Sequence, residues 1–166
     1  MLVEQTEERE IDEQVRMFGE NMRSARHGAG LSQVELSSAS RVDRAAISFL
    51  ERAKRSPDLP TLLRAAHALG VRPADLVRGI GPDGSRVRVA LNDDTPSDPA
   101  ARFGANLRWA RQRAKLSQEA LALQAKVDRA AISIYEHGRR EPNLRTILKL
   151  ARALELPPAT LLRDVE

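Results

Sequence analysis

The chain has 166 residues and a formal net charge of +4, with 27 Lys and Arg against 23 Asp and Glu. It contains no cysteine, which excludes disulfides and thiolate metal sites. No apolar run approaches the roughly 20 residues of a membrane-spanning helix, and the acidic N-terminal segment does not resemble a signal peptide. Aromatic residues make up 3% of the chain while Ala and Leu abound, which favours an all-α fold.

One segment of the chain occurs twice. LSQVELSSASRVDRAAISFLE begins at Leu31, and LSQEALALQAKVDRAAISIYE begins 85 residues later at Leu116. Residues 18–78 match residues 103–163 without a gap, and about half of the positions are identical. We therefore expect a first domain at 1–78, with an acidic N-terminal extension of its first helix, a linker at 79–102 and a second domain at 103–166.

Charge is distributed unevenly between the repeats and their flanks. Residues 18–78 hold 10 Lys and Arg against 6 Asp and Glu, and residues 103–163 hold 12 against 5. Residues 1–17 sum to −4. This distribution favours two cationic modules that face a polyanion, and ordinary solvated surface is the alternative.

Each repeat is predicted to form five short helices. Apolar residues at helical spacing mark one face of the first helix: Phe18, Met22, Ala25 and Ala29, repeated as Phe103, Leu107, Ala110 and Ala114. Ser32 and Ser117 are placed to cap the second helix, and Glu35 completes a capping box in the first repeat only.

The remaining elements follow from caps and prolines. Asp43 and Asp128 are expected to cap the third helix, and Pro73 and Pro158 suit the first turn of the fifth. Between the repeats, RVRVAL at residues 86–91 alternates as a short strand would, but it has no evident partner strand.

Two short helices joined by a tight turn, the second opening with a cap and a basic residue, describe a helix-turn-helix. Each repeat resembles the Cro/C1-type (XRE family) helix-turn-helix domain, a five-helix DNA-binding module. The resemblance lies in LSQ, in AISFLE and AISIYE, and in KRSPDLPTLLRAAHAL and RREPNLRTILKLARAL. It covers about three quarters of the chain and implies two tandem lambda-repressor-like domains.

The resemblance implies that the third helix of each repeat enters the major groove, with its N-terminal residues at base edges. The residues expected there are Arg44, Ala45 and Ser48, and Arg129, Ala130 and Ser133. Arg can bond guanine through two atoms and an Ala methyl can pack on thymine. Alternatively, Arg44 and Arg129 contact only phosphates or are solvated surface charges.

Other positions are assigned to the DNA backbone or to the fold. In the family, residues placed like Gln33 and Gln118 bond a phosphate; the alternative is a solvated polar residue. Arg55 and Arg140, in the loop after the third helix, are expected to touch phosphates. The resemblance also implies structural ion pairs, with direct DNA contact as the alternative: Arg26 with Glu51, and Arg111 with Glu136.

The sequence departs from the family pattern at the turn between the second and third helices. The family usually has Gly at this position, whereas this chain has Arg41 and Lys126. Either these residues adopt a left-handed conformation at a cost of about 1 kcal/mol, or the turn differs. Their cations would be placed to meet phosphates. Phe49 and Ile134 fall near the groove-facing side and contact either thymine methyls or the other domain.

Together these features predict a cytoplasmic, nucleoid-associated and sequence-specific regulator of transcription, a repressor, that reads two similar half-sites. Its expected partners are double-stranded DNA and RNA polymerase, with a homodimer or an intramolecular pseudo-dimer as its assembly and no cofactor. A linker of 24 residues spans roughly 25–30 Å, which permits inverted or direct half-sites. The alternative is a protein-interaction module, such as an antitoxin or adaptor. An enzyme has little support, because the three histidines lie in different elements.

Overall fold

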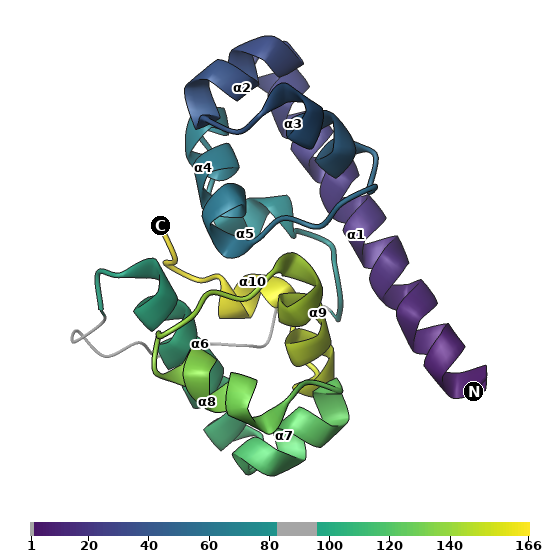
Figure 1. Ribbon diagram of the computed structural model, residues 1–166, viewed down its shortest axis with the longest axis vertical. Helices are drawn as coiled ribbons and strands as arrows, with labels where there is room; N and C mark the ends of the chain where they lie inside the picture. The colour runs from purple at the N-terminus through teal and green to yellow at the C-terminus, as the bar shows by residue number, and fades with distance from the viewer. Residues whose placement is uncertain (1, 83–95) are drawn as a thin grey trace.

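In the computed structural model, the backbone is described for residues 2–82 and 96–166, and the side chains from residue 5 onward. This part of the chain is helical and contains no strand (Figure 1). The helices are α1 (Leu2–Gly28), α2 (Gln33–Ser40), α3 (Arg44–Glu51), α4 (Leu59–Leu69), α5 (Pro73–Leu76), α6 (Pro99–Arg113), α7 (Gln118–Ala125), α8 (Arg129–Glu136), α9 (Leu144–Ala153) and α10 (Pro158–Leu161). Each repeat therefore has five helices. The segment 86–91, expected as a strand, lies outside the described residues.

The helix starts confirm the predicted caps. Ser32 and Glu35 form the capping box at α2, and the carboxylates of Asp43 and Asp128 accept from the first turns of α3 and α8. Helix α6 begins at Pro99, inside the range expected as linker. Its cap is Asp98, whose Oδ2 accepts from the Ala101 N–H at 2.8 Å. Asp followed by Pro is common at helix starts and also in linkers, so the sequence did not distinguish the two.

The first helix of each repeat crosses the third helix closely. Phe18 and Met22 are fully buried on this face, whereas Ala29 lies beyond the end of α1 and is exposed, contrary to expectation. A Cβ at Gly19 would stand 2.7 Å from the carbonyl oxygen of Leu50, and one at Gly104 would stand 2.3 Å from that of Tyr135. These two glycines let the backbones of α1 and α3, and of α6 and α8, approach this closely.

The helix-turn-helix turns adopt the left-handed conformation. Arg41 has a φ of 55° and Lys126 a φ of 52°, so of the two geometries expected for the turn the strained one is present. Ala53 has a φ of 54° and its counterpart Gly138 one of 63°, so the chain leaves α3 and α8 in the same way.

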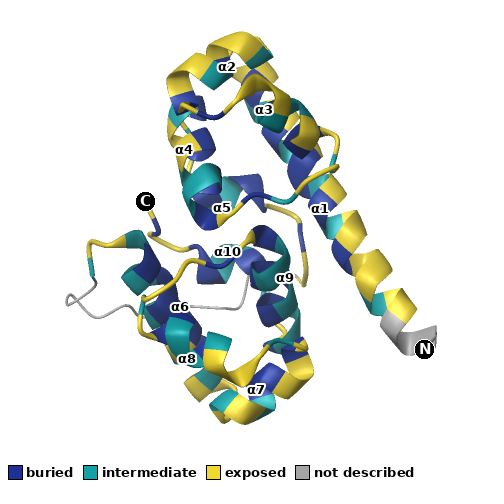
Figure 2. Cartoon of the chain, viewed as in Figure 1, coloured by how far each residue is buried: buried dark blue, intermediate teal, exposed yellow. Residues whose placement is uncertain are grey.

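Helix α1 is longer than α6, and its N-terminal part packs on the second repeat. This part runs along α9 and is mostly exposed (Figure 2). Its buried side carries Ile11 and Val15, which belong to the same apolar core cluster as Leu148 and Ala151 of α9. The two repeats therefore share buried contacts and are not independent modules on a tether.

The repeats meet through equivalent parts. The Leu59 N–H donates to the carbonyl oxygen of Pro142 at 3.0 Å, and the Leu144 N–H donates to that of Pro57 at 2.8 Å. Between them Asp58 and Asn143 form an isolated antiparallel bridge. Helix α5 likewise packs against its counterpart α10. In these contacts equivalent groups of the two repeats meet with their roles exchanged, which defines an isologous interface around a pseudo-twofold axis.

Candidate nucleic-acid interface

Helices α3 and α8 are the third helices expected to enter the major groove (the reading helices), and each turns one side outward. Ile47, Leu50 and Glu51 are buried on the inner side of α3. The spacing of a helix then places Ala45, Ser48, Phe49 and Arg52 together on the opposite side. In α8 the corresponding residues are Ala130, Ser133, Ile134 and His137. His137 was not among the residues predicted to bind DNA, although its spacing of four from Ser133 placed it on this side.

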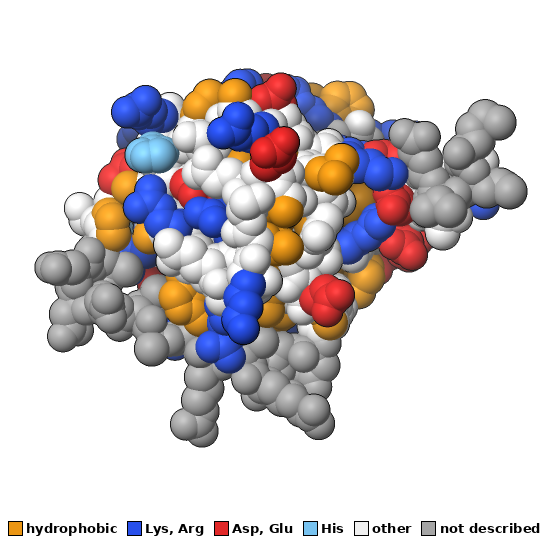
Figure 3. All heavy atoms as spheres, turned by 90° about the horizontal axis from the view of Figure 1, so that it is seen from below, with side chains coloured by type: hydrophobic (Ala, Val, Ile, Leu, Met, Phe, Trp, Pro, Cys, Tyr) orange, Lys and Arg blue, Asp and Glu red, His pale blue; other side chains and the backbone are white. Residues whose placement is uncertain are grey.

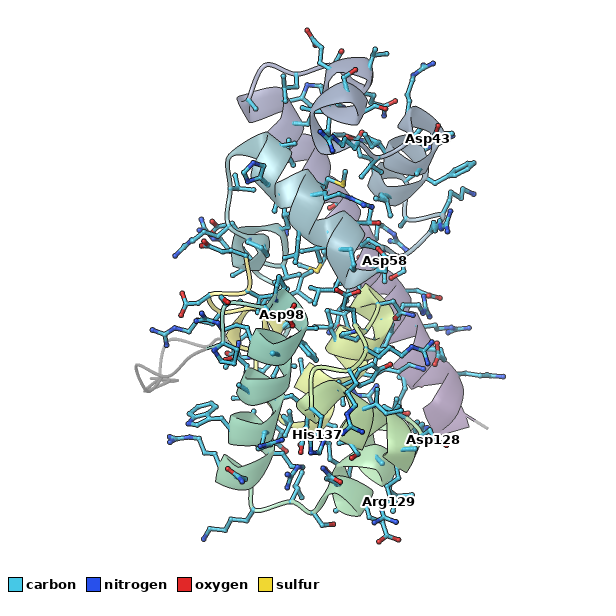
Figure 4. All side chains as sticks on the ribbon, turned by 60° about the vertical axis from the view of Figure 1, so that its left-hand side comes forward. Asp43, Asp58, Asp98, Asp128, Arg129 and His137 are labelled. Atoms are coloured by element: carbon cyan, nitrogen blue, oxygen red, sulfur yellow. The ribbon has the colours of Figure 1, made fainter. Side chains whose placement is uncertain are left out.

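Arg44 and Arg129, predicted to contact bases, lie at the exposed N-termini of the reading helices. Neither guanidinium has a hydrogen-bond partner in the described part of the chain, so both are free to meet a ligand. Asp43 and Asp128, the caps just before them, lie toward opposite ends of the molecule on the same side in Figure 4, with Asp58 between them. Arg129 itself projects at the lower end of that view.

A buried carboxylate anchors each helix-turn-helix. Arg26 donates from Nε to Oε1 of Glu51 at 2.6 Å and from Nη2 to Oε2 at 3.1 Å. Arg111 and Glu136 repeat this pairing at 2.6 and 3.0 Å. Burial opposes the charged form of Glu51, but the bonds from Arg26 and then Gln33 outweigh it, so its pKa lies below the ordinary value of 4.5. The pKa of Glu136 is lowered for the same reasons, by Arg111 and Gln118.

The two glutamines expected to bond phosphates are tied to these carboxylates. Gln33 Nε2 donates to Glu51 Oε2 at 3.0 Å, and Gln118 Nε2 donates to Glu136 Oε2 at 2.8 Å. An amide nitrogen carries two hydrogens, so each glutamine keeps one donor for another acceptor. The first helix, the start of the second and the end of the third are thus held together in each repeat.

The basic residues of the turns and loops differ in their surroundings. Arg41 is exposed, and Arg55 and Arg140 are exposed in the loops that lead to the pseudo-twofold axis. Lys126, predicted to meet a phosphate, has its ammonium 2.5 Å from Oε2 of Glu7 in the α1 extension. Sequence reasoning missed this partner because it lies 119 residues earlier in the chain.

Helix α9 presents a cationic side to the same extension. Arg145 bonds Glu8 and Asp12 at 2.8 and 2.7 Å, and Lys149 bonds Glu8 at 2.8 Å. Arg152 bonds Glu7 at 2.7 Å. Acidic side chains of the N-terminal segment therefore neutralise part of the positive charge of the second repeat.

The surface charge is mixed. On the face seen from below, Lys and Arg side chains are scattered among apolar ones and do not form one unbroken basic patch (Figure 3). Among the described residues, no group of three or more His, Asp or Glu side chains is placed to hold a metal ion. None of the helices in that part of the chain has the length and apolar character of a membrane span.

Two pseudo-symmetric repeats, each presenting an exposed arginine at the capped start of an outward helix, define a tandem helix-turn-helix DNA-binding protein. The family model described as Helix-turn-helix matches residues 22–76 and again residues 107–161, about two thirds of the chain. The chain belongs to the Cro/C1-type (XRE) helix-turn-helix family of DNA-binding transcription regulators.

No match was found among curated proteins. Among solved structures, the chain is similar to the restriction-modification controller protein C.AhdI from Aeromonas hydrophila. The two are 35% identical, the similarity covers 37% of this chain and 94% of that chain, and the TM-score is 0.37.

Proposed function

We propose that this chain is a sequence-specific repressor of transcription that reads two similar half-sites, arranged as an inverted repeat, on one face of a DNA duplex. The observation that carries the proposal is the isologous contact between the repeats. A twofold axis between two reading helices matches the twofold symmetry of an inverted repeat. A direct repeat would require the helices to be related by a translation instead.

Supporting features lie on either side of this axis. The loops that follow α3 and α8 meet at Asp58 and Asn143, so the two reading helices flank the same end of the axis. Their outward sides carry the same residues at the N-terminal positions, including Arg44 and Arg129. Two like surfaces related by a twofold axis fit two like half-sites. In the family such half-sites lie one DNA turn apart, about 34–36 Å.

Exposed arginines outside the reading helices fit the DNA backbone. Arg55 and Arg140 are exposed at equivalent positions in the loops that lead to Asp58 and Asn143, and in the proposed complex they would neutralise phosphates on both sides of the centre of the operator. Binding of this kind weakens steeply as salt rises, because each neutralised phosphate releases counterions. Bound at the nucleoid over a promoter, a pseudo-dimer that covers both half-sites would exclude RNA polymerase, which is the simplest route to repression.

The test is selection of bound duplexes from a random pool, followed by a gel shift at low salt. We expect an enriched motif with two similar halves in inverted order at one fixed spacing. A direct repeat would contradict the proposed geometry. Absence of any retarded duplex at low salt would overturn the proposal and favour a protein-interaction module. Transcription in vitro then tests repression: an operator that overlaps the promoter should reduce transcript, and one placed far upstream should not.

A further inference from the structure

The outward sides of the two reading helices differ at two adjoining positions. Ala45, Ser48 and Arg44 have identical counterparts in the second repeat, but Phe49 is replaced by Ile134 and Arg52 by His137. Phe49 and Ile134 lie one turn beyond the N-terminal residues, and Arg52 and His137 are the C-cap residues at the other end of the helices, on the same side away from the core. The difference is therefore placed where the helix faces its ligand.

In the first repeat these two positions form one unit. Phe49 is 43% exposed, an unusual state for a large apolar side chain, and the guanidinium of Arg52 lies over its ring at 5.6 Å from the centroid. Arg52 also donates from Nε to the carbonyl oxygen of Ser48 at 3.1 Å. The ring and the planar cation are thus held together at the surface of α3.

The second repeat presents a smaller and less cationic surface. Nδ1 of His137 lies 2.7 Å from the carbonyl oxygen of Ser133, so it uses the anchor that Arg52 uses in α3. Ile134 is half-buried and lines a shallow hollow of about 350 Å³ with Gln118, Arg129, Ala130 and Ser133. An aliphatic side chain and an imidazole stand here in place of a ring and a guanidinium.

We propose that the two repeats read half-sites that differ at the base pairs facing residues 49 and 52, so that the chain binds its operator in one orientation. This inference rests on the proposed function and adds direction to it. A broad aromatic ring packs on thymine methyls differently from a branched aliphatic side chain, and Arg offers a planar fork of donors that His lacks. Identical subunits of a homodimer cannot distinguish the two ends of an operator, whereas two unlike repeats in one chain can.

The first experiment compares selected operators. For the wild-type chain we expect inverted half-sites that differ at one or two base pairs, and about tenfold weaker binding when one half-site replaces the other. The double variant Phe49→Ile with Arg52→His should select two like half-sites. The matched double variant, Ile134→Phe with His137→Arg, should also select two like half-sites, both of the kind that the first repeat reads. Unlike half-sites that persist in both variants would overturn the assignment to these residues.

The second experiment measures orientation directly. Because the chain has no cysteine, Ser38→Cys on α2 gives a single attachment point for an iron chelate that cleaves nearby DNA. We expect cleavage at one end of the operator, and at the opposite end for Leu123→Cys, the equivalent position on α7, which is 79% exposed. Bound duplex with equal cleavage at both ends would overturn the inference alone. Failure of any duplex to bind would overturn the proposed function with it.

Discussion

Asp58 and Asn143 face each other as an antiparallel bridge, although they occupy the same position in two repeats 85 residues apart. The backbone bonds on either side, from Leu59 to Pro142 and from Leu144 to Pro57, fix the repeats against each other. The separation of the two reading helices is consequently a property of this interface and not of the segment that links the repeats.

The first prediction concerns that separation. Inserting four Gly or Ser residues after Asp94 should leave the preferred half-site spacing unchanged, because the docked interface sets the distance. Selection from duplexes with spacings of several base pairs on either side of the optimum measures it. A flexible tether would instead broaden the range of tolerated spacings, with affinity following the effective concentration. A broadened range would show that the repeats do not stay docked on DNA.

Arg44 and Arg129 are expected to carry base discrimination. Arg44→Ala should remove about 1–3 kcal/mol of preference at one base pair of one half-site, and Arg129→Ala should do so in the other. Arg44→Lys keeps the charge but not the two-pronged donor, so it should also relax the preference while retaining most non-specific affinity. Binding to a panel of single-base operator variants is the measurement. An unchanged motif in all three variants would reassign these arginines to phosphates.

The loop arginines should behave differently. Arg55→Ala is expected to weaken binding to every duplex alike, because a phosphate contact carries no sequence information. It should also reduce the slope of log K against log salt by about 0.9, the contribution of one neutralised phosphate. Arg140→Ala should do the same. A shift in consensus without a change in slope would contradict the phosphate role.

The α1 extension permits a comparison of apolar and charged contacts. Ile11 is 1% exposed and lies with the second repeat, so Ile11→Ala should lower the free energy of unfolding by about 2–5 kcal/mol. Glu8 bonds two cations of α9 but is half-exposed, so Glu8→Gln should cost at most about 1 kcal/mol. Urea unfolding measures both. A larger loss for Glu8→Gln would mean that charge holds the extension in place.

Glu51 and Glu136 make stability depend on pH in the acid range. Because the folded pKa of each lies below the ordinary 4.5, their contribution is complete above pH 4.5 and is lost as pH falls through the lowered value. Glu51→Gln should make this acid limb of the stability profile shallower, with the contribution of Glu136 remaining. At neutral pH it should cost about 3–5 kcal/mol, since Arg26 stays buried without its carboxylate.

A paired replacement separates charge from packing. Arg26→Met with Glu51→Leu removes both charges and should recover much of that loss at neutral pH, while the acid limb stays shallower than in the wild type because only Glu136 of the two still contributes. Thermal unfolding between pH 3 and pH 7 follows both effects. An acid limb that is as steep in these variants as in the wild type would show that other carboxylates control acid unfolding.

The sequence alone predicted the duplicated helices and their caps, because these depend on residues close together in the chain. Ser32 with Glu35, and Asp43 and Asp128, act within one turn of their own helix. The exposed positions of Arg44 and Arg129 follow from the same local reasoning. Helix α6 shows where local signals compete, since Asp98 and Pro99 suit a linker and a helix start equally well.

Only the tertiary structure decided how the repeats are joined. Backbone N–H and C=O groups make the hydrogen bonds at Pro57, Leu59, Pro142 and Leu144. Nearly every residue carries these groups, so no side-chain pattern predicts the bonds. Lys126 with Glu7 joins residues far apart in the chain, and only packing brings them together. The sequence by itself determined two cationic helix-turn-helix units with like reading helices. The twofold relation between those units, on which the proposed inverted operator depends, arises from long-range contacts that local periodicity does not encode.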